Sequence, residues 1–399
     1  MSYTLLLDLD DTLLANPMDQ FLPAYLGKLS THLSAYVEPS VMVQALLAGT
    51  RQMVENQQPD CTLMDVFGSV FYPSLRLQPQ EIQPAIEQFY ADVFPSLQQL
   101  TQIKPGAIEL VDTAFERGYR VAISTSPLFP KTAVIQRLEW AGLSPRKYPF
   151  DLVGSFEYFH FSKPNPAFFA EMLARMGWPE DPVVVVGNDL ENDIHSATLL
   201  GLPTYLVLQE GAPKKNSNVR PMAAGDLTEL LPWLDQTPPE MLLPRYDEPP
   251  ALLAILRSTP AALNGICQAV DPGRLAIRPK PEAWSPTEIL CHLRDVDADV
   301  NLPRLKKVLT EENPFIPGAD ADRWAAERGY DQQDGQAALH RFSITRQELI
   351  NLMGKMSPED WIRPARHAIF GPTHIKELAS INASHDQIHI RQLLDALSN

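Results

Sequence analysis

The sequence predicts a doubly wound parallel α/β domain with a helical insertion, followed by an all-α four-helix bundle. In residues 1–236, short apolar runs alternate with amphipathic stretches, as strands and helices do in a doubly wound sheet. Residues 249–399 show only stretches of helical length and period. Between them, five prolines occur in the thirteen residues from Pro238 to Pro250. Because helix interiors and central strands exclude proline at this density, residues 237–248 are predicted to be a linker.

Length and composition agree with two globular domains. The 399 residues exceed the roughly 250 to 300 at which a single hydrophobic core stops growing, and 45% of them are hydrophobic. The net charge is −16, and residues 1–248 carry most of it, with 16 basic and 30 acidic side chains. This acidity argues against nucleic acid or an anionic membrane as the partner. Three scattered cysteines and an N-terminus without a signal-peptide pattern predict a cytoplasmic protein.

The elements of the first domain follow from its apolar runs and glycines. Four runs are predicted to be buried parallel strands: residues 3–7, 119–124, 183–187 and 203–208. Four glycines follow amphipathic stretches, as left-handed helix caps do: Gly118, Gly142, Gly177 and Gly201. Residues from 16 to about 100 contain no convincing strand and read as helices punctuated by Pro23, Pro39, Pro59, Pro73, Pro79, Pro84 and Pro95. A helical insertion after the first strand is therefore expected.

The second domain is predicted to contain helices only. Four stretches have helical periodicity: residues 251–270, 286–311, 333–356 and 373–397. The second is the best marked, because Ser285 and Glu288 form a capping box and Pro286 occupies the first helical position. Four helices of this length suggest a bundle.

Polar residues gather where the predicted strands of the first domain end. They are Asp8, Asp10, Asp11 and Thr12 after the first strand, Ser124, Thr125 and Ser126 after the second, and Asn188, Asp189 and Asp193 after the third. Clustered carboxylates repel one another unless a cation neutralises them, and hard oxygen ligands suit Mg²⁺. A lysine and a hydroxyl beside that cation would bind a phosphoryl group, and Lys163 lies in a nearby loop. One aspartate would attack phosphorus, while a second, two residues on, would protonate the leaving oxygen.

These residues resemble a known family over residues 3–235. Four motifs of the haloacid dehalogenase-like (HAD) hydrolase superfamily, which has a Rossmann-like fold, are similar in order and spacing to Asp8-Leu9-Asp10-Asp11-Thr12-Leu13, Thr125, Lys163-Pro164 and Gly187-Asn188-Asp189-x-x-x-Asp193. The resemblance implies a phosphatase for a small phosphorylated metabolite. The dehalogenases of the superfamily lack the second aspartate, so Asp10 favours phosphoryl chemistry.

The resemblance also implies a role for each catalytic residue. Asp8 would be the nucleophile that forms an aspartyl-phosphate, and Asp10 the general acid and then base. Thr125 would hydrogen-bond the phosphoryl oxygens, with Ser124 and Ser126 as competing hydroxyls, and Ser126 is also predicted to bind substrate. Lys163 would stabilise Asp8 and the transferred group.

The same resemblance implies a Mg²⁺ site and a lid. Asp8, Asp189 and the backbone carbonyl of Asp10 would ligate the metal, and Asp193 would position it with its waters. Asp11 stands where many members have glycine. Residues 16–100 correspond to a C1-type helical cap, which closes over small substrates and excludes water. His160 and His195 are predicted to be structural, because this mechanism needs no histidine.

Histidines are concentrated in the second domain, which holds six of the nine. Two helical seams that face the bundle interior carry three of them. These seams consist of Ile289, His292, Val296 and Val300 on the second helix and Ile375, Leu378, Asn382, His385, His389 and Leu393 on the last. Three imidazoles converging from two helices can hold a divalent transition metal and leave a position open. Hydrogen-bonded core histidines are the alternative interpretation.

This domain is similar to a second family. Trp284-Ser285-Pro286-Thr287-Glu288-Ile289-Leu290-Cys291-His292-Leu293 and His385-Asp386-Gln387-Ile388-His389 resemble the corresponding segments of DinB-like four-helix bundles, over about residues 250–399. The resemblance implies a metal triad of His292, His385 and His389. Histidine ligands suit Zn²⁺ and Ni²⁺ alike, so the metal stays open. Cys291 is predicted to be structural, and His340, His367 and His374 to lie at the surface or in loops.

Three hypotheses for the whole chain follow. In the first, the N-terminal domain is a Mg²⁺-dependent phosphatase. In the second, the main activity lies in the bundle, as a metal-dependent transferase for a low-molecular-weight thiol. In the third, the bundle is a non-catalytic module that either binds a partner or dimerises. In the case of dimerisation, the protein would be a homodimer.

Overall fold

The computed structural model describes residues 2–208 and 218–398 and divides into two compact units. The first comprises the chain up to Gln57, Cys61–Phe168 and Pro179–Pro244. The second runs from Arg245 onward and also takes in Gln58–Asp60 and Phe169–Trp178, which lie outside the predicted range 249–399. No helix among the described residues combines the length and apolarity that crossing a membrane requires.

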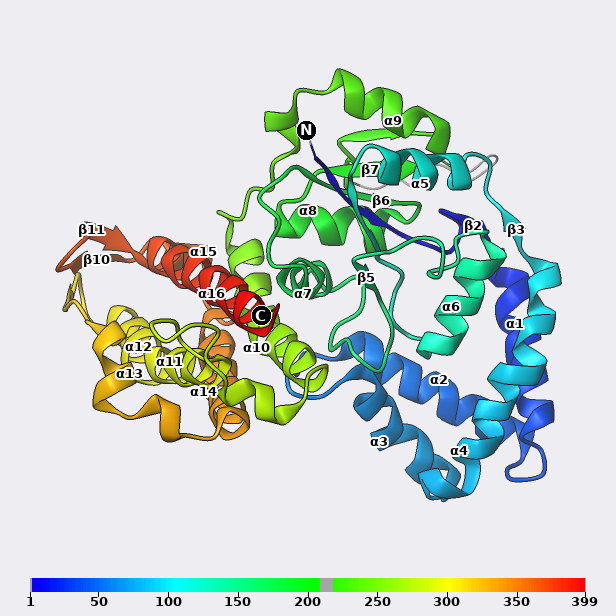
Figure 1. The fold of residues 1–399 in the computed structure, drawn as a ribbon, viewed down its shortest axis with the longest axis horizontal. Helices are drawn as coiled ribbons and strands as arrows, with labels where there is room; N and C mark the ends of the chain where they lie inside the picture. The colour runs from blue at the N-terminus through cyan, green and yellow to red at the C-terminus, as the bar shows by residue number, and fades with distance from the viewer. Residues whose placement is uncertain (1, 209–217, 399) are drawn as a thin grey trace. The chain divides into compact units, whose positions relative to one another are not determined.

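A six-stranded parallel sheet forms the centre of the first unit (Figure 1). Its order is β5-β4-β1-β6-β7-β8, with bounds of Leu152–Val153, Arg120–Ile123, Thr4–Leu7, Val183–Gly187, Thr204–Val207 and Ala223–Gly225. This order confirms the doubly wound fold, and β1, β4, β6 and β7 lie within the four predicted runs. The sequence missed β5 and β8, which have two and three residues and are too short to show a periodic pattern.

Alternating side chains bury both faces of the sheet. Leu5, Leu7 and Val184 belong to the main core together with residues of α5 (Ala107–Glu116) and α9 (Leu227–Gln236). Leu6 points to the opposite face and is equally buried. Because both faces of this parallel sheet are buried, its central strands consist of consecutive apolar residues.

The four predicted glycine caps are confirmed. Gly118, Gly142, Gly177 and Gly201 have φ between 71° and 84°, where only glycine avoids steric strain. They follow α5, α6 (Lys131–Trp140), α7 (Ala167–Arg175) and α8 (Ser196–Leu200).

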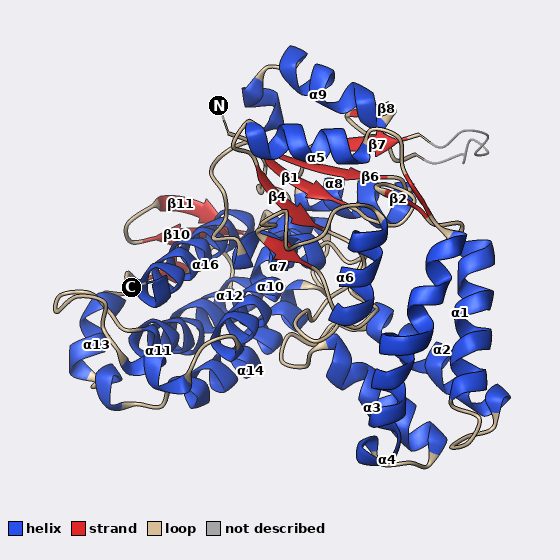
Figure 2. Ribbon diagram, turned by 45° about the vertical axis from the view of Figure 1, so that its right-hand side comes forward, coloured by secondary structure: helices blue, strands red, loops and turns tan. Residues whose placement is uncertain are grey.

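The insertion is helical, as expected (Figure 2). It contains α1 (Met18–His32), α2 (Pro39–Glu55), α3 (Leu63–Leu75) and α4 (Pro79–Gln88), followed by a π-helical turn (Phe89–Val93) and a 3₁₀ helix (Phe94–Leu100). A two-stranded ribbon of β2 (Leu14–Ala15) and β3 (Gln102–Ile103) joins its ends to the sheet domain. The prolines punctuate it only in part: Pro39 and Pro79 begin helices, whereas Pro23, Pro73 and Pro84 lie inside them.

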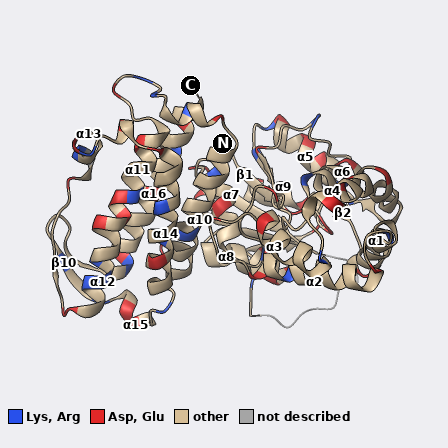
Figure 3. Cartoon of the chain, turned by 90° about the horizontal axis from the view of Figure 1, so that it is seen from below, with Lys and Arg blue, Asp and Glu red and all other residues tan. Residues whose placement is uncertain are grey.

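The second unit contains the predicted four-helix bundle. Its helices are α10 (Pro249–Gln268), α11 (Pro286–Val296), α14 (Gly335–Met353) and α16 (Ile375–Ser398). The second predicted helix, residues 286–311, is divided into three consecutive elements. They are α11, which ends at Val296, a π-helical turn at Asp297–Asn301, and α12 (Leu302–Thr310). The capping box of Ser285 and Glu288 is confirmed. Acidic and basic residues are interspersed along these helices (Figure 3).

The expectation of helices only is wrong for this unit. A small sheet joins β9 (Phe315–Ile316), β10 (Pro364–His367) and β11 (Gly371–His374). Its strands have two to four residues and two of them contain proline, so their sequence resembles loops. Two short helices, α13 (Trp324–Glu327) and α15 (Pro358–Trp361), were also not predicted.

Candidate functional site

The carboxyl end of β1 places Asp8 at the edge of the sheet. Leu7 pairs in register with Ile123 of β4 and Val186 of β6, so the loops after these three strands meet. The Asp8 amide donates to the Val186 carbonyl at 2.9 Å, which fixes the backbone at the start of the loop. The structure thus brings the ends of the first three predicted strands together.

Lys163 is the centre of a buried charge cluster. Its ammonium donates to Asp8 Oδ1 at 2.7 Å and also to Asp193 Oδ1, and all three side chains are at most one-tenth exposed. Burial alone would lower the pKa of Lys163, but Asp193 and Asp8 together raise it to about 12. The lysine is therefore permanently cationic.

Asp8 is held on both of its oxygens. Its Oδ2 accepts a hydrogen bond from the Thr12 hydroxyl at 3.0 Å, while Oδ1 faces Lys163. Burial raises the pKa of Asp8 to about 7, although the attraction of Lys163 opposes this. These two contacts fix the orientation of the Asp8 carboxyl group at the edge of the sheet.

Asp193 and Asp189 are joined through the backbone at the end of β6. Asp193 Oδ2 accepts the Asp189 amide at 3.0 Å. Asp189 Oδ1 in turn accepts the amides of Glu191 and Asn192, both at 2.9 Å, and so caps the π-helical turn that follows. Both aspartates thus stabilise the backbone of this segment, and their predicted role at a metal stays a prediction.

Asp10 has partners that the sequence did not indicate. Asn16 donates to Asp10 Oδ1 at 2.9 Å, and the guanidinium of Arg137 on α6 forms an ion pair with Oδ2. The Arg137 side chain is only 2% exposed and lies over the Phe129 ring. Arg137 belongs to none of the sequence motifs. It is 127 residues from Asp10 in the sequence, and only the fold brings the two side chains together.

Asp11 occupies the position that favours glycine for a conformational reason. Its φ is 58°, in the left-handed region that aspartate tolerates better than most residues. Its carboxylate accepts the Asn16 amide at 2.9 Å, which stabilises the turn. The departure from the family pattern is therefore compatible with the same loop.

Three residues with hydroxyl groups follow β4, the strand that pairs with β1. Ser124 and Thr125 are buried and Ser126 is half-buried. Among the described residues, the Ser124 hydroxyl has no hydrogen-bond partner. The preference for Thr125 over its neighbours stays a prediction.

A second site lies in the bundle, where three histidines converge. His292 comes from α11 and His385 and His389 from α16, and one nitrogen from each lies within 4.8 Å of the others. The Nε2 atoms of His292 and His389 approach the Nε2 of His385 at 3.0 and 3.1 Å. Among the described residues, this is the group of three or more histidine, cysteine or acidic side chains that meets this distance criterion.

The triad cannot be satisfied by hydrogen bonds alone. A neutral imidazole nitrogen either donates one proton or accepts with one lone pair, so His385 Nε2 can serve only one of its two neighbours. Burial lowers the pKa of both His292 and His385 to about 3, which keeps these rings neutral and their lone pairs free. Three lone pairs aimed at one point suit a divalent cation.

Outer contacts orient this triad. His389 Nδ1 lies 2.8 Å from Gln392 Oε1, so its other nitrogen points inward as an acceptor. The Trp284 ring lies 5.0 Å from His292 and stacks on His389 at 6.1 Å, measured between ring centroids. A cavity of about 270 Å³ adjoins the three rings. The geometry therefore offers ligands together with space for a small molecule.

Comparisons with known proteins match two different families to the N-terminal and C-terminal parts of the chain. The model of the haloacid dehalogenase-like hydrolase family matches residues 4–201, and that of the DinB superfamily matches residues 255–393. The chain joins a haloacid dehalogenase-like hydrolase domain to a DinB domain. Both family predictions are thereby confirmed.

Relatives of this HAD–DinB chain match only in part. The ribulose-1,5-bisphosphate 5-phosphatase of Halopiger xanaduensis is 35% identical over 102 residues, which are 26% of this chain and 41% of that protein. A protein of Oceanobacillus iheyensis named as a metal-dependent hydrolase is 27% identical over 110 residues, 28% of this chain and 63% of its own. The chain thus spans less than two thirds of either relative.

Solved structures are similar at lower identity. The HAD phosphatase of Thermococcus onnurineus is 20% identical, with a TM-score of 0.40, and the match covers 59% of this chain and 98% of that one.

The hydrolase domain has a ligand set that fits Mg²⁺. Four aspartates, Asp8, Asp10, Asp189 and Asp193, lie in the segments that follow β1 and β6, two strands that pair in register. A divalent cation with a preference for hard oxygen ligands would reduce the repulsion among these carboxylates.

The histidines outside the triad agree with the predictions only in part, because His374, predicted to lie at the surface or in a loop, is half-buried in β11. His160 is buried, and His340 is exposed on α14. The prediction for His367 is wrong, because it is only 4% exposed on β10 and its ring stacks on Phe370. Cys291 is buried and donates to Gln333, in line with a structural role.

Proposed function

We propose that the hydrolase domain is a Mg²⁺-dependent phosphatase that cleaves a small phosphomonoester through a phosphoryl group on Asp8. The observation that carries the proposal is the clamp on Asp8. Its carboxylate lies between the Lys163 ammonium and the Thr12 hydroxyl, at the edge where three strands end. Mg²⁺, when held by Asp8, Asp189 and the Asp10 carbonyl, would supply positive charge for the phosphoryl oxygens.

The chain's own residues account for both steps of this reaction. Asp8 attacks phosphorus while the bond from phosphorus to the ester oxygen breaks, and protonated Asp10 gives that oxygen its proton. A water then attacks the phosphoryl group on Asp8 and loses its proton to Asp10, which restores both carboxyl groups. Lys163, with the hydroxyl of Thr125 or Ser126, stabilises the charge on the transferred group. The helical cap excludes water.

Replacement of the nucleophile tests this proposal. Asp8→Asn keeps the size of the side chain and removes its charge, so hydrolysis of p-nitrophenyl phosphate with Mg²⁺ should fall at least about 10³-fold. Asp92→Asn, at an exposed position of the cap, is the matched control and should keep the parental rate. A folded Asp8→Asn protein with parental activity would rule out the assignment.

The substrate class comes from the relative's name alone. Because the Halopiger protein acts on a sugar phosphate, pentose phosphates should be included in a panel of phosphometabolites assayed on the full chain.

A second proposal concerns the DinB domain: we infer that its triad binds a divalent transition metal. The support is the pair of Nε2 contacts that no protonation of His385 can satisfy together. Zn²⁺ and Ni²⁺ both suit the ligands. The alternatives of thiol transfer and of a dimerisation module stay predictions, without support among the described residues.

Metal analysis of the full chain tests the triad. The parent should hold about one transition-metal ion per chain by plasma mass spectrometry, and His385→Ala should hold less than about 0.1. His340→Ala changes an exposed histidine of the same domain and should leave the metal in place. Equal metal in the parent and in His385→Ala would exclude the triad as the ligand set.

A further inference from the structure

Two adjoining cavities lie behind the histidine triad. The first, of about 270 Å³, includes His292, His385 and His389 in its wall. The second, of about 60 Å³, is lined mainly by apolar side chains. Four residues line both cavities: Asn301, Arg304, Ile381 and Asn382. A polar belt therefore separates the triad from an apolar hollow.

Arg304 of α12 is a cation without a counterion in this belt. Its Nη2 donates to the Pro317 carbonyl at 2.9 Å. Burial lowers the pKa of Arg304, and no carboxylate among the described residues raises it in return. Asp320 at the edge of the cavity pairs instead with Arg323 at 2.7 Å. The remaining N–H donors of Arg304 are thus available to an anion.

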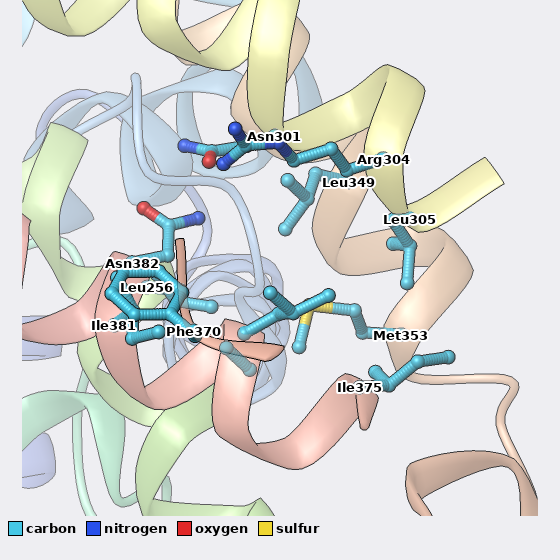
Figure 4. Close-up of a pocket in the computed structure, with 12 residues that line it drawn as sticks. Leu256, Asn301, Arg304, Leu305, Leu349, Met353, Phe370, Ile375, Ile381 and Asn382 are labelled. Carbon is cyan, nitrogen blue, oxygen red and sulfur yellow. The ribbon is translucent and has the colours of Figure 1, made fainter. Parts of the chain in front are cut away.

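Asn382 adds an unsatisfied polar group to the same wall. It is 6% exposed, and its buried Oδ1 has no hydrogen-bond partner in the part of the chain that the structure describes. Rotation of the amide would present its N–H groups at this place instead, so either orientation calls for a polar ligand. Asn301 is fixed by its donation to Asp297 at 2.9 Å. Figure 4 shows the polar groups of Asn301, Arg304 and Asn382 on one side and Leu305, Met353 and Ile375 on the other.

We propose that these cavities bind a short-chain carboxylate, with its anion on Arg304 and its alkyl group in the apolar hollow. A single guanidinium matches a monoanionic carboxylate, because its planar fork donates two parallel hydrogen bonds. A phosphate dianion would call for more than one cation. The hollow is less than half of the roughly 150 Å³ that accommodates benzene in another protein, so it fits only a few carbons.

The carboxylate site rests on the proposed function in one respect only. If the triad holds a metal, the ligand lies beside it, and the DinB domain would act on or sense a small organic acid. Binding to Arg304 itself does not require the metal, so the two claims can be tested separately on the same samples.

Titration of the full chain with butanoate tests the inference. Binding is followed by saturation-transfer NMR, on metal-free and on Zn²⁺-loaded protein. The parent should bind butanoate at least tenfold more tightly than butanamide, which has the same shape without the charge, and more tightly than inorganic phosphate. Arg304→Gln should weaken butanoate binding at least tenfold. Arg341→Gln, at an exposed arginine of α14, should change nothing.

A second variant tests the hollow. Ala379 is buried in its wall, so Ala379→Leu should weaken binding of butanoate and leave that of acetate unchanged. Equal binding of butanoate and butanamide by the parent would overturn the proposal, whether or not the variants fold. If the chain takes up no Zn²⁺ but still shows Arg304-dependent binding of butanoate, the carboxylate site is supported and the metal site is refuted.

Discussion

At the residue scale, the site depends on one lysine that holds two aspartates. Lys163 fixes Asp8 from one side and Asp193 from the other, so disturbance of Asp193 should reach the nucleophile. The position of Asp193 in turn depends on Gly187, because a Cβ there would lie 2.3 Å from the Asp193 carboxyl carbon. An absent side chain thus sets the geometry of the site.

Gly187→Ala should therefore impair catalysis without touching a reacting group. We expect kcat/KM for p-nitrophenyl phosphate to fall at least about tenfold, since a small misplacement of a positioning group costs one to two orders of magnitude. Gly27→Ala is the matched control, because a Cβ at Gly27 meets nothing within 4 Å. Parental kinetics in Gly187→Ala would show that Asp193 does not position Lys163.

Motif residues were predictable at this scale, and their partners were not. Asp8, Lys163 and Asp193 follow from local pattern and strand ends. Arg137 and Asn16 reach Asp10 through folding alone, so nothing in their sequence neighbourhood indicates this contact. His367 was misjudged for a similar reason, since a strand too short to predict buries it.

At the element scale, the bundle is joined by a buried ionic cluster. Arg346 of α14 pairs with Asp297 of the π-helical turn and Asp386 of α16, and Thr259 of α10 donates to Asp386 at 2.7 Å. All three charged side chains are at most 1% exposed. The cluster has two aspartates for one arginine, and one of these aspartates, Asp386, is on α16 next to the triad residue His385.

Removal of its single cation should be costly. Arg346→Met leaves two buried carboxylates without their cationic partner, and we expect a loss of about 3 to 5 kcal/mol in the free energy of unfolding. Arg341→Met on the same helix is the exposed control. Urea unfolding of the full chain, followed by circular dichroism, measures both. A loss equal to that of the control would mean that the cluster does not support the bundle.

Removal of one carboxylate should have a smaller effect that depends on pH. Burial, opposed by Arg346, raises the pKa of Asp297, so folding favours its protonated form. The stability of the parent relative to Asp297→Asn should therefore fall as pH rises above about 4. The same unfolding measurements at pH 5 and pH 8 show the sign, and a relative gain for the parent at pH 8 would contradict it.

Most elements were predictable because they are long and periodic. The four bundle helices and the four central strands were found from apolar spacing alone. The π-helical turn at Asp297–Asn301 and the sheet of β9, β10 and β11 were not predicted. These elements are too short to produce a recognisable pattern of apolar residues. Asn301, the last residue of that turn, and Arg304, just after it, belong to the polar belt beside the triad.

At the scale of the whole molecule, two sites of opposite ligand chemistry share one chain. The hydrolase domain offers carboxylate oxygens, which suit Mg²⁺, and the DinB domain offers imidazoles, which suit Zn²⁺ or Ni²⁺. The acidity counted from the sequence lies mainly in the first 248 residues, which contain the carboxylate site. Sequence motifs predicted both sites, whereas the small-molecule cavity beside the triad required the structure.

The central claim is that a phosphoryl group passes through Asp8, and trapping that group tests it most directly. In Asp10→Asn the base for the second step is missing, while p-nitrophenolate leaves without an acid. After incubation of the full chain with p-nitrophenyl phosphate and Mg²⁺, acid quenching and mass spectrometry should find one phosphoryl group on the peptide containing Asp8. The double variant Asp8→Asn, Asp10→Asn should carry none. A phosphoryl group on another residue, or equal labelling of the double variant, would contradict the account.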